Sequence, residues 1–182
     1  MQKKDNVSHG LRWGTIIGLV YCVLLFLRYS LGVKSPIVFG ALTLCGFIIV
    51  LVLLLVCGIK RKKQLGGYIE LKDAFQTMFV AVICFEIFYT AFNFIYLKYI
   101  NPDFFQQLKD ATEAFMVNNK VSQKDIDDSV NKIDIQASKN MNLGTSFLSL
   151  AYSVLISGIF ALIFALIIKK KKPYQPIDQL DS

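Results

Sequence analysis

The residues that build most metal and disulfide sites are scarce in this sequence. Its 182 residues include one histidine, and its cysteines lie far apart, without CxxC spacing: Cys22, Cys45, Cys57 and Cys84. A structural zinc site normally needs four Cys or His ligands, and a disulfide framework needs closely organised cysteine pairs. All four cysteines lie in apolar runs, where a thiol packs as a small apolar group. The sequence therefore predicts no metal site and no disulfide framework.

Motifs that carry catalysis are absent as well. The sequence contains no HExxH, no GxSxG, no P-loop and no pair of intramembrane aspartates. Proteolysis and phosphoryl transfer depend on such groups. We therefore expect no enzyme activity, no catalytic residues and no bound cofactor.

Charged residues are also few, at 18%, whereas hydrophobic residues make up 54%. The mean hydropathy is +0.50. A soluble domain of this size has roughly a quarter of its residues charged, so the lipid bilayer is the expected solvent. The net charge of +7 comes from Lys and Arg next to apolar runs, not from a patch on a polar domain. This distribution excludes nucleic acid as a partner.

Four apolar runs divide the chain, at about 13–31, 36–59, 74–97 and 143–168. Each run meets the roughly 20 residues that a helix needs to cross about 30 Å of hydrocarbon. The fold class predicted for 1–182 is a single all-α, polytopic integral membrane domain, with four transmembrane helices in a four-helix bundle. The first run also resembles a secretory signal, with small residues Ser30 and Gly32 at cleavage-like spacing; Arg28 just before them favours an uncleaved span.

Basic residues orient the predicted spans, because Lys and Arg in short loops are retained in the cytoplasm. They gather in the N-terminal tail, at 60–63 after the second run and at 169–172 after the fourth. In the long segment 98–142, by contrast, acidic residues offset the lysines. We expect a multi-pass protein of the cell inner (cytoplasmic) membrane, with cytoplasmic N- and C-termini and a periplasmic segment 98–142.

The segment 98–142 has the pattern of a helical hairpin. Asn101 and Pro102 are typical of a helix start, Asn118 and Asn119 of a turn, and Ser122 of a second helix cap. Each helix carries an apolar stripe, so the two either bury one another or lie on the membrane surface. The tail 173–182, which contains Pro173 and Pro176, is expected to be disordered.

Two ionisable side chains stand within the spans, Arg28 in the first and Glu86 in the third. Because a charge in the bilayer centre is costly, each is a candidate functional residue. Counting from Trp13 and Asp73 puts Arg28 and Glu86 at similar depth, which predicts a salt bridge. Thr90 and Asn93 extend from Glu86 on one helix face and complete a candidate polar site.

Three interpretations of that site remain open. Glu86 pairs with Arg28 while Thr90 and Asn93 bond neighbouring helices; or the strip lines an outward-open cavity for a solute or proton; or Arg28 snorkels and Glu86 is protonated.

Small residues recur every fourth position in two spans. Such ladders form flat faces on which two helices approach closely. The first comprises Gly10, Gly14 and Gly18; the second comprises Thr145, Ser149, Ser153, Ser157, Ala161 and Ala165. They predict helix packing, either inside the bundle or, for the second ladder, across a homodimer.

Several of these features together resemble one protein family. They are the glycine ladder, the basic block with Gly66, Gly67 and Tyr68 behind it, the segment 70–75 that begins the third span, and the long outer segment before the last span. In these features the chain is similar to an uncharacterised bacterial membrane family, mainly of Bacteroidota, known as domain of unknown function 4199. The resemblance implies a four-helix inner-membrane protein and supplies no activity and no site residues.

The function predicted from the sequence is that of a structural or accessory interaction protein, with the lipid bilayer, a homo-oligomer or another membrane protein as partner. The alternative is a small-solute or ion carrier that uses Glu86. A pocket at Glu86 would favour the carrier, whereas Arg28 closed on Glu86 in dry packing would favour the accessory role.

Overall fold

The computed structural model describes residues 2–141 and 143–171, so the predicted tail 173–182 lies outside the described residues. Within them the secondary structure is helical, as predicted, and no strand forms beyond one isolated bridge between Ile69 and Lys170. The helices are α1 (Gln2–Gly32), α2 (Pro36–Gln64), α3 (Leu71–Ile95), η1 (Tyr96–Ile100), α4 (Phe104–Asn118), α5 (Gln123–Met141) and α6 (Leu143–Ile168).

Four of these helices are long and apolar enough to cross a membrane, which confirms the predicted number of spans. The candidate spans are Lys4–Gly32, Pro36–Gln64, Leu71–Ile100 and Gly144–Ile168. Large apolar side chains on them point outward; Phe147 and Leu148 of α6, for example, are 71% and 73% exposed. An outward-facing apolar surface of this kind is stable in lipid and not in water.

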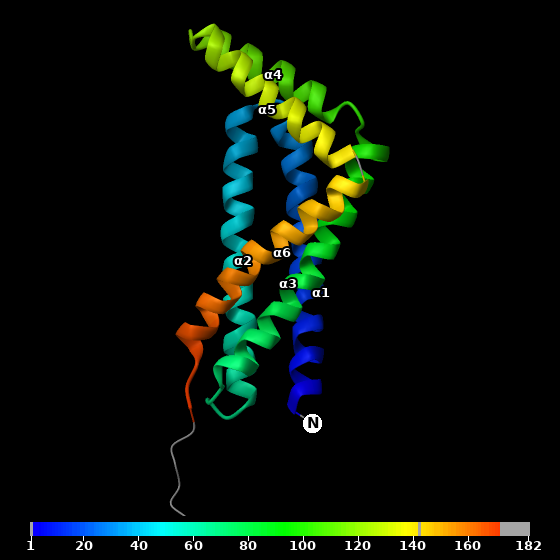
Figure 1. Cartoon of the computed structure of the whole chain (residues 1–182). Coiled ribbons are helices and arrows are strands. Elements are labelled where there is room, and N and C mark those ends of the chain that lie inside the picture. Colours follow the sequence, from blue (N-terminus) through cyan, green and yellow to red (C-terminus); the bar gives the residue numbers. More distant parts are fainter. Residues whose placement is uncertain (1, 142, 172–182) are drawn as a thin grey trace, which may run out of the picture.

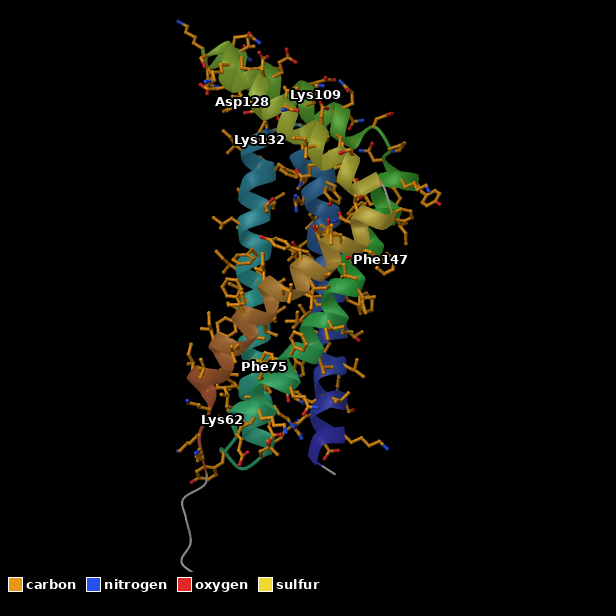
Figure 2. All side chains as sticks on the ribbon, viewed as in Figure 1. Lys62, Phe75, Lys109, Asp128, Lys132 and Phe147 are labelled. Atoms are coloured by element: carbon orange, nitrogen blue, oxygen red, sulfur yellow. The ribbon has the colours of Figure 1, made fainter. Side chains whose placement is uncertain are left out.

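The basic blocks lie together at one end of the molecule, which we call the basic end. Asn6 near the start of α1 hydrogen bonds to Asp73 near the start of α3. The strand-like bridge from Ile69 to Lys170 brings the end of α6 to the same place. Figure 2 shows Lys62 at this end and Lys109, Asp128 and Lys132 at the opposite one, which we call the hairpin end. The basic residues of the N-terminal tail, of 60–63 and of the segment after α6 therefore share one end, as the positive-inside pattern requires.

The glycine ladder of the first span faces α3. A Cβ added at Gly10 would lie 2.5 Å from the Thr77 carbonyl oxygen, and one added at Gly14 would lie 2.6 Å from Cβ of Cys84. At Gly18 the nearest atom, in Phe88, would be 2.8 Å away. Only a residue without a side chain fits at these distances. The ladder thus sets how closely α1 and α3 approach each other.

The ladder of the fourth span is divided between two environments. Ala161 and Ala165, near the basic end, are fully buried against α2 and α3, whereas Ser149, nearer the hairpin end, is exposed. Figure 1 shows the reason, because α6 crosses the bundle obliquely in front of α2 and α3. The buried part of the ladder serves packing inside one chain.

Segment 98–142 forms two helices, α4 and α5, which lie across one end of the bundle (Figure 1). The helix α4 begins at Phe104, two residues later than Pro102. Asp125 N donates to Ser122 Oγ at 3.3 Å, so α5 has the predicted cap. Phe104 and Leu108 are buried in the bundle's end. The first half of α4 therefore packs on protein and not on a membrane surface.

Buried side chains form two separate clusters along the bundle. One, at the basic end, includes Leu54, Met78, Ala81 and Ala165. The other, at the hairpin end, includes Leu25, Tyr29, Tyr96 and Phe104. The region between the two clusters holds Glu86.

Candidate binding cavity around Glu86

Glu86 lies near the middle of the candidate span Leu71–Ile100 and is only 2% exposed. Ser157 of α6 donates a 2.8 Å hydrogen bond from its hydroxyl to Oε1 of Glu86. Ser153, one turn earlier on α6, lies beside the same carboxyl. The other carboxyl oxygen, Oε2, is buried and has no hydrogen-bond partner within the described part of the chain. An unpaired buried acceptor is costly, so this carboxyl lacks one of the interactions that would stabilise its charged form.

The carboxyl of Glu86 borders a cavity of about 330 Å³, here called the Glu86 cavity. Its walls come from α1, α2, α3 and α6 and are mostly apolar. The lining residues are Ile17, Tyr21, Phe47, Val50, Leu51, Leu54, Ala81, Val82, Phe85, Glu86, Tyr89, Tyr152, Ser153, Ile156, Ser157 and Phe160. Sites for small molecules have this composition, an apolar enclosure with a few convergent polar groups.

The predicted salt bridge between Arg28 and Glu86 is wrong. Within the described residues an ion pair of 2.9 Å joins Lys109 to Asp134 in the hairpin, and none is found between Arg28 and Glu86. The Arg28 guanidinium carbon lies 4.1 Å from the ring centroid of Phe39. Arg28 is thus a cation stacked on an aromatic face, and its Nε atom has no hydrogen-bond partner in that part of the chain.

The register of α1 against α3 explains why the salt bridge does not form. Asn6 bonds Asp73, 67 positions later, and Tyr29 bonds Asn93, 64 positions later. Arg28 and Glu86 are separated by fewer positions, so Arg28 lies roughly 9 to 13 Å further toward the hairpin end at 1.5 Å per residue. The predicted depths took Trp13 as the inner end of the helix, but α1 begins at Gln2.

The polar residues that share one face of α3, namely Glu86, Thr90 and Asn93, line two different pockets. Thr90 and Asn93 line a small pocket of about 50 Å³ with residues of α6, and they do not line the Glu86 cavity. Asn93 accepts a hydrogen bond from the Tyr29 hydroxyl and is buried. Of the three interpretations left open by the sequence, the one in which Glu86, Thr90 and Asn93 line a single cavity does not match these two separate pockets. Thr90 and Asn93 face the α1 and α6 interfaces instead.

Arg28 lines a third, larger cavity of about 660 Å³ toward the hairpin end, here called the Arg28 cavity. This cavity and the Glu86 cavity have three aromatic residues in common, namely Tyr21, Phe47 and Tyr89. The three rings thus stand between two neighbouring spaces.

A separate polar cluster lies at the basic end. Arg61, 7% exposed, donates from Nε to Oδ1 of Asn6 at 2.8 Å, and Asn6 donates to Oδ1 of Asp73 at 2.8 Å. Arg61 also donates to Oε1 of Gln64 at 3.2 Å. The chain of bonds connects α2, α1 and α3. We assign it to fixing the register of these helices, since no cavity borders it among those described here.

The sequence did not reveal the partners of Glu86. Ser153 and Ser157 were predicted to pack helices. One signal was present in the sequence, because the only intramembrane acid needs a donor and serines four positions apart on one apolar helix can supply it. No group of three or more metal-ligating side chains occurs in the described residues.

Comparison with known proteins identifies the chain's relatives and supplies no activity. The family described as "Protein of unknown function (DUF4199)" matches residues 12–170, which include most of the first span, the other three spans and the hairpin. No curated protein and no solved structure gives a significant match.

Proposed function

The chain belongs to the DUF4199 family of proteins of unknown function, and we propose from its own residues that it is a membrane carrier that binds a small solute in the Glu86 cavity. One observation carries the proposal: a cavity of about 330 Å³ is lined by Glu86, an intramembrane acid with one carboxyl oxygen that has no protein partner within the described residues. An accessory protein needs packed helices and gains nothing from such a space. The Arg28 side chain does not close it.

The carboxyl supplies the chemistry of binding. An unpaired carboxylate in an apolar enclosure is unfavourable, so Glu86 is stable either as the neutral acid or as the anion with a ligand beside it. Switching between these two states changes the affinity of the cavity. A carrier needs a site with two such states, because a solute must bind on one side and be released on the other.

The proposed carrier lies in the bacterial inner membrane with its basic end in the cytoplasm. Support for this orientation is the gathering of the N-terminal, central and C-terminal basic residues at one end of the bundle. The hairpin of α4 and α5 then lies in the periplasm, next to the Arg28 cavity. We assign no catalysis to the protein.

Access to the cavity can be tested with dicyclohexylcarbodiimide, an apolar reagent that modifies carboxyl groups in apolar surroundings. We expect it to modify Glu86 in native membranes, as located by peptide mass spectrometry. Leu51 lines the cavity opposite α3, so Leu51→Phe should slow the modification severalfold by filling the space. Glu86→Gln is the control that identifies the modified peptide. A Glu86 that stays unmodified, or reacts equally fast in Leu51→Phe, would contradict the proposal.

The accessory role stays a second candidate, and a different part of the molecule favours it. Near the turn of the hairpin, Phe115 and Val117 are 37% and 56% exposed. Exposed apolar side chains at the tip of an extramembrane hairpin are suited to contact another protein. A photo-crosslinking residue at Val117 should then capture one defined protein in native membranes, and the same probe at exposed Lys132 should not. Capture of lipid alone would contradict this role.

A further inference from the structure

The lining of the Glu86 cavity combines one acid with many aromatic rings. Six aromatic side chains border it: Tyr21, Phe47, Phe85, Tyr89, Tyr152 and Phe160. Glu86 is the only carboxyl among the lining residues, and no Lys, Arg or His lines the cavity. The ligand-facing surface is therefore apolar, rich in π electrons and able to hold one negative charge.

The rings stand on two sides of the space. On one side, Tyr21 of α1 packs edge-on against Phe85 of α3, with ring centroids 5.3 Å apart, and against Tyr89 at 5.7 Å. On the other side, Phe47 of α2 meets Phe160 of α6 at 5.8 Å, also edge-on. Faces of aromatic rings attract a cation placed within about 6 Å of the centroid.

The carboxyl completes this arrangement. Ser157 occupies one oxygen, Oε1, while Oε2 is buried without a partner in the described structure. A positive charge in the cavity, close to this carboxylate, would offset its buried negative charge and would be attracted by the surrounding rings as well. We propose that the Glu86 cavity binds a lipophilic organic cation, a single ammonium group with apolar substituents; this inference rests on the proposed carrier function.

Other classes of ligand fit the cavity less well. An inorganic cation such as Na⁺ or Ca²⁺ requires a shell of several oxygen ligands, whereas the cavity offers one carboxyl, two serines and phenols on separate walls. A neutral apolar molecule leaves Oε2 unpaired. An anion is attracted by Arg28, but Arg28 lies in the neighbouring cavity, stacked on Phe39.

Binding of such a cation is coupled to a proton. When the cavity is empty the carboxyl holds its proton; when the cation enters, the O–H bond breaks, the proton passes to water and the ammonium takes its place beside the carboxylate. The other titratable side chains that face the cavity are Tyr21 from α1, Tyr89 from α3 and Tyr152 from α6, and α2 supplies none. One cation thus exchanges for one proton, and affinity rises with pH.

A pair of probes separates charge from shape. Benzyltrimethylammonium and 2,2-dimethylpropylbenzene have the same shape and differ in one atom, a positive nitrogen in place of carbon. Binding to the full-length protein in lipid nanodiscs is measured by calorimetry at two pH values, with empty nanodiscs subtracted. We expect the cation to bind with one site per chain, at least about tenfold more tightly than its isostere, and more tightly at the higher pH.

Two variants test the assignment of residues. Glu86→Gln should reduce cation binding at least about tenfold and abolish its dependence on pH, with little change for the isostere. Phe160→Leu keeps the wall apolar and removes a ring, so it should weaken binding of the cation more than that of the isostere. The Phe160→Leu variant therefore still tests the inference if Glu86→Gln does not fold.

Equal binding of the two probes, or cation binding that ignores both variants, would overturn the inference. If Glu86 still reacts with the carbodiimide in that case, the cavity is accessible and the carrier proposal survives with another class of solute. If Glu86 also fails to react, the carrier proposal is lost with it.

Discussion

The Ser157 hydroxyl donates a 2.8 Å hydrogen bond to Oε1 of Glu86 and so joins α6 to α3 across 71 positions of the sequence. The bond fixes the orientation of the carboxyl, because one oxygen is held by α6 while the other is buried without a hydrogen-bond partner within the described residues. A single small residue of α6 thereby serves two purposes. It allows close packing of helices, and it presents an acid to a ligand.

Ser157→Ala should destabilise the protein. It removes the hydrogen-bond donor of a buried acceptor without adding bulk, and an unsatisfied buried polar group costs about 1 to 3 kcal/mol. The measurement is the unfolding free energy or melting temperature in detergent. Ser149→Ala is the matched control on the same helix, at an exposed position of the same ladder, and should be close to neutral. Equal stability of both variants would show that the bond contributes little.

Gly14→Ala should destabilise the pairing of α1 with α3. The added Cβ would lie 2.6 Å from Cβ of Cys84 and 2.7 Å from the Ala81 carbonyl oxygen, so the helices must move apart. Overpacking of this kind typically costs about 1 to 3 kcal/mol. Gly40→Ala provides the control in α2, where an added Cβ meets nothing within 4 Å and alanine favours the helix. A Gly14→Ala protein as stable as wild type would contradict the close packing.

Asn6→Leu should be more destabilising than its position near the chain start suggests. Asn6 is fully buried, accepts a bond from Arg61 and donates one to Asp73. Leucine is similar in size but breaks both bonds and leaves Arg61 short of an acceptor, a loss of about 2 to 4 kcal/mol for two bonds to charged groups. The control is Lys62→Leu, next to Arg61 on the same helix. Unfolding in detergent measures the difference, and similar losses in both variants would argue against a structural network.

Fusion of a reporter that is active only in the periplasm tests the orientation. A fusion in the α4–α5 turn near Asn118 should be active, and a fusion after Gln64 should be inactive, because basic residues retain the second site in the cytoplasm. Replacing Lys60, Lys62 and Lys63 by glutamine should reduce this contrast. The reverse pattern of activity would place the hairpin in the cytoplasm and the basic end outside.

The number and extent of the spans could be predicted because hydropathy and length follow directly from the requirement to cross lipid. The second hairpin helix could be predicted from Ser122 and Asp125, since a cap is a local interaction. The Arg28 pairing could not, because it depends on the register between two helices. That register is set by Asn6 and the glycine ladder, and the polar start of α1 was not counted as helix.

The hydrogen-bond partner of Glu86 could not be predicted either, because it too depends on how two helices pack. Its burial was predictable from the apolar sequence around it, but the choice of Ser157 as donor depends on how α6 crosses α3 (Figure 1). Thr90 and Asn93 share a helix face with Glu86 and lie beside α6 as Glu86 does, yet Asn93 also bonds Tyr29 of α1. A face identified on one helix does not specify which neighbour covers it.

The separation of Arg28 from Glu86 leads to the last prediction, which a double-mutant cycle tests. Arg28→Leu and Glu86→Gln should each change stability, and the double variant should equal their sum to within about 0.5 kcal/mol, because roughly 9 to 13 Å along the helices separates the two positions. Tyr29→Phe with Asn93→Leu is the positive control on the same two helices, since these residues are joined by a hydrogen bond, and we expect a coupling of about 1 kcal/mol. Both cycles are measured by reversible unfolding in the same detergent. If instead Arg28 and Glu86 couple as strongly as the control pair, an ion pair forms between them in the membrane, and the free carboxyl oxygen on which the binding site depends is already occupied.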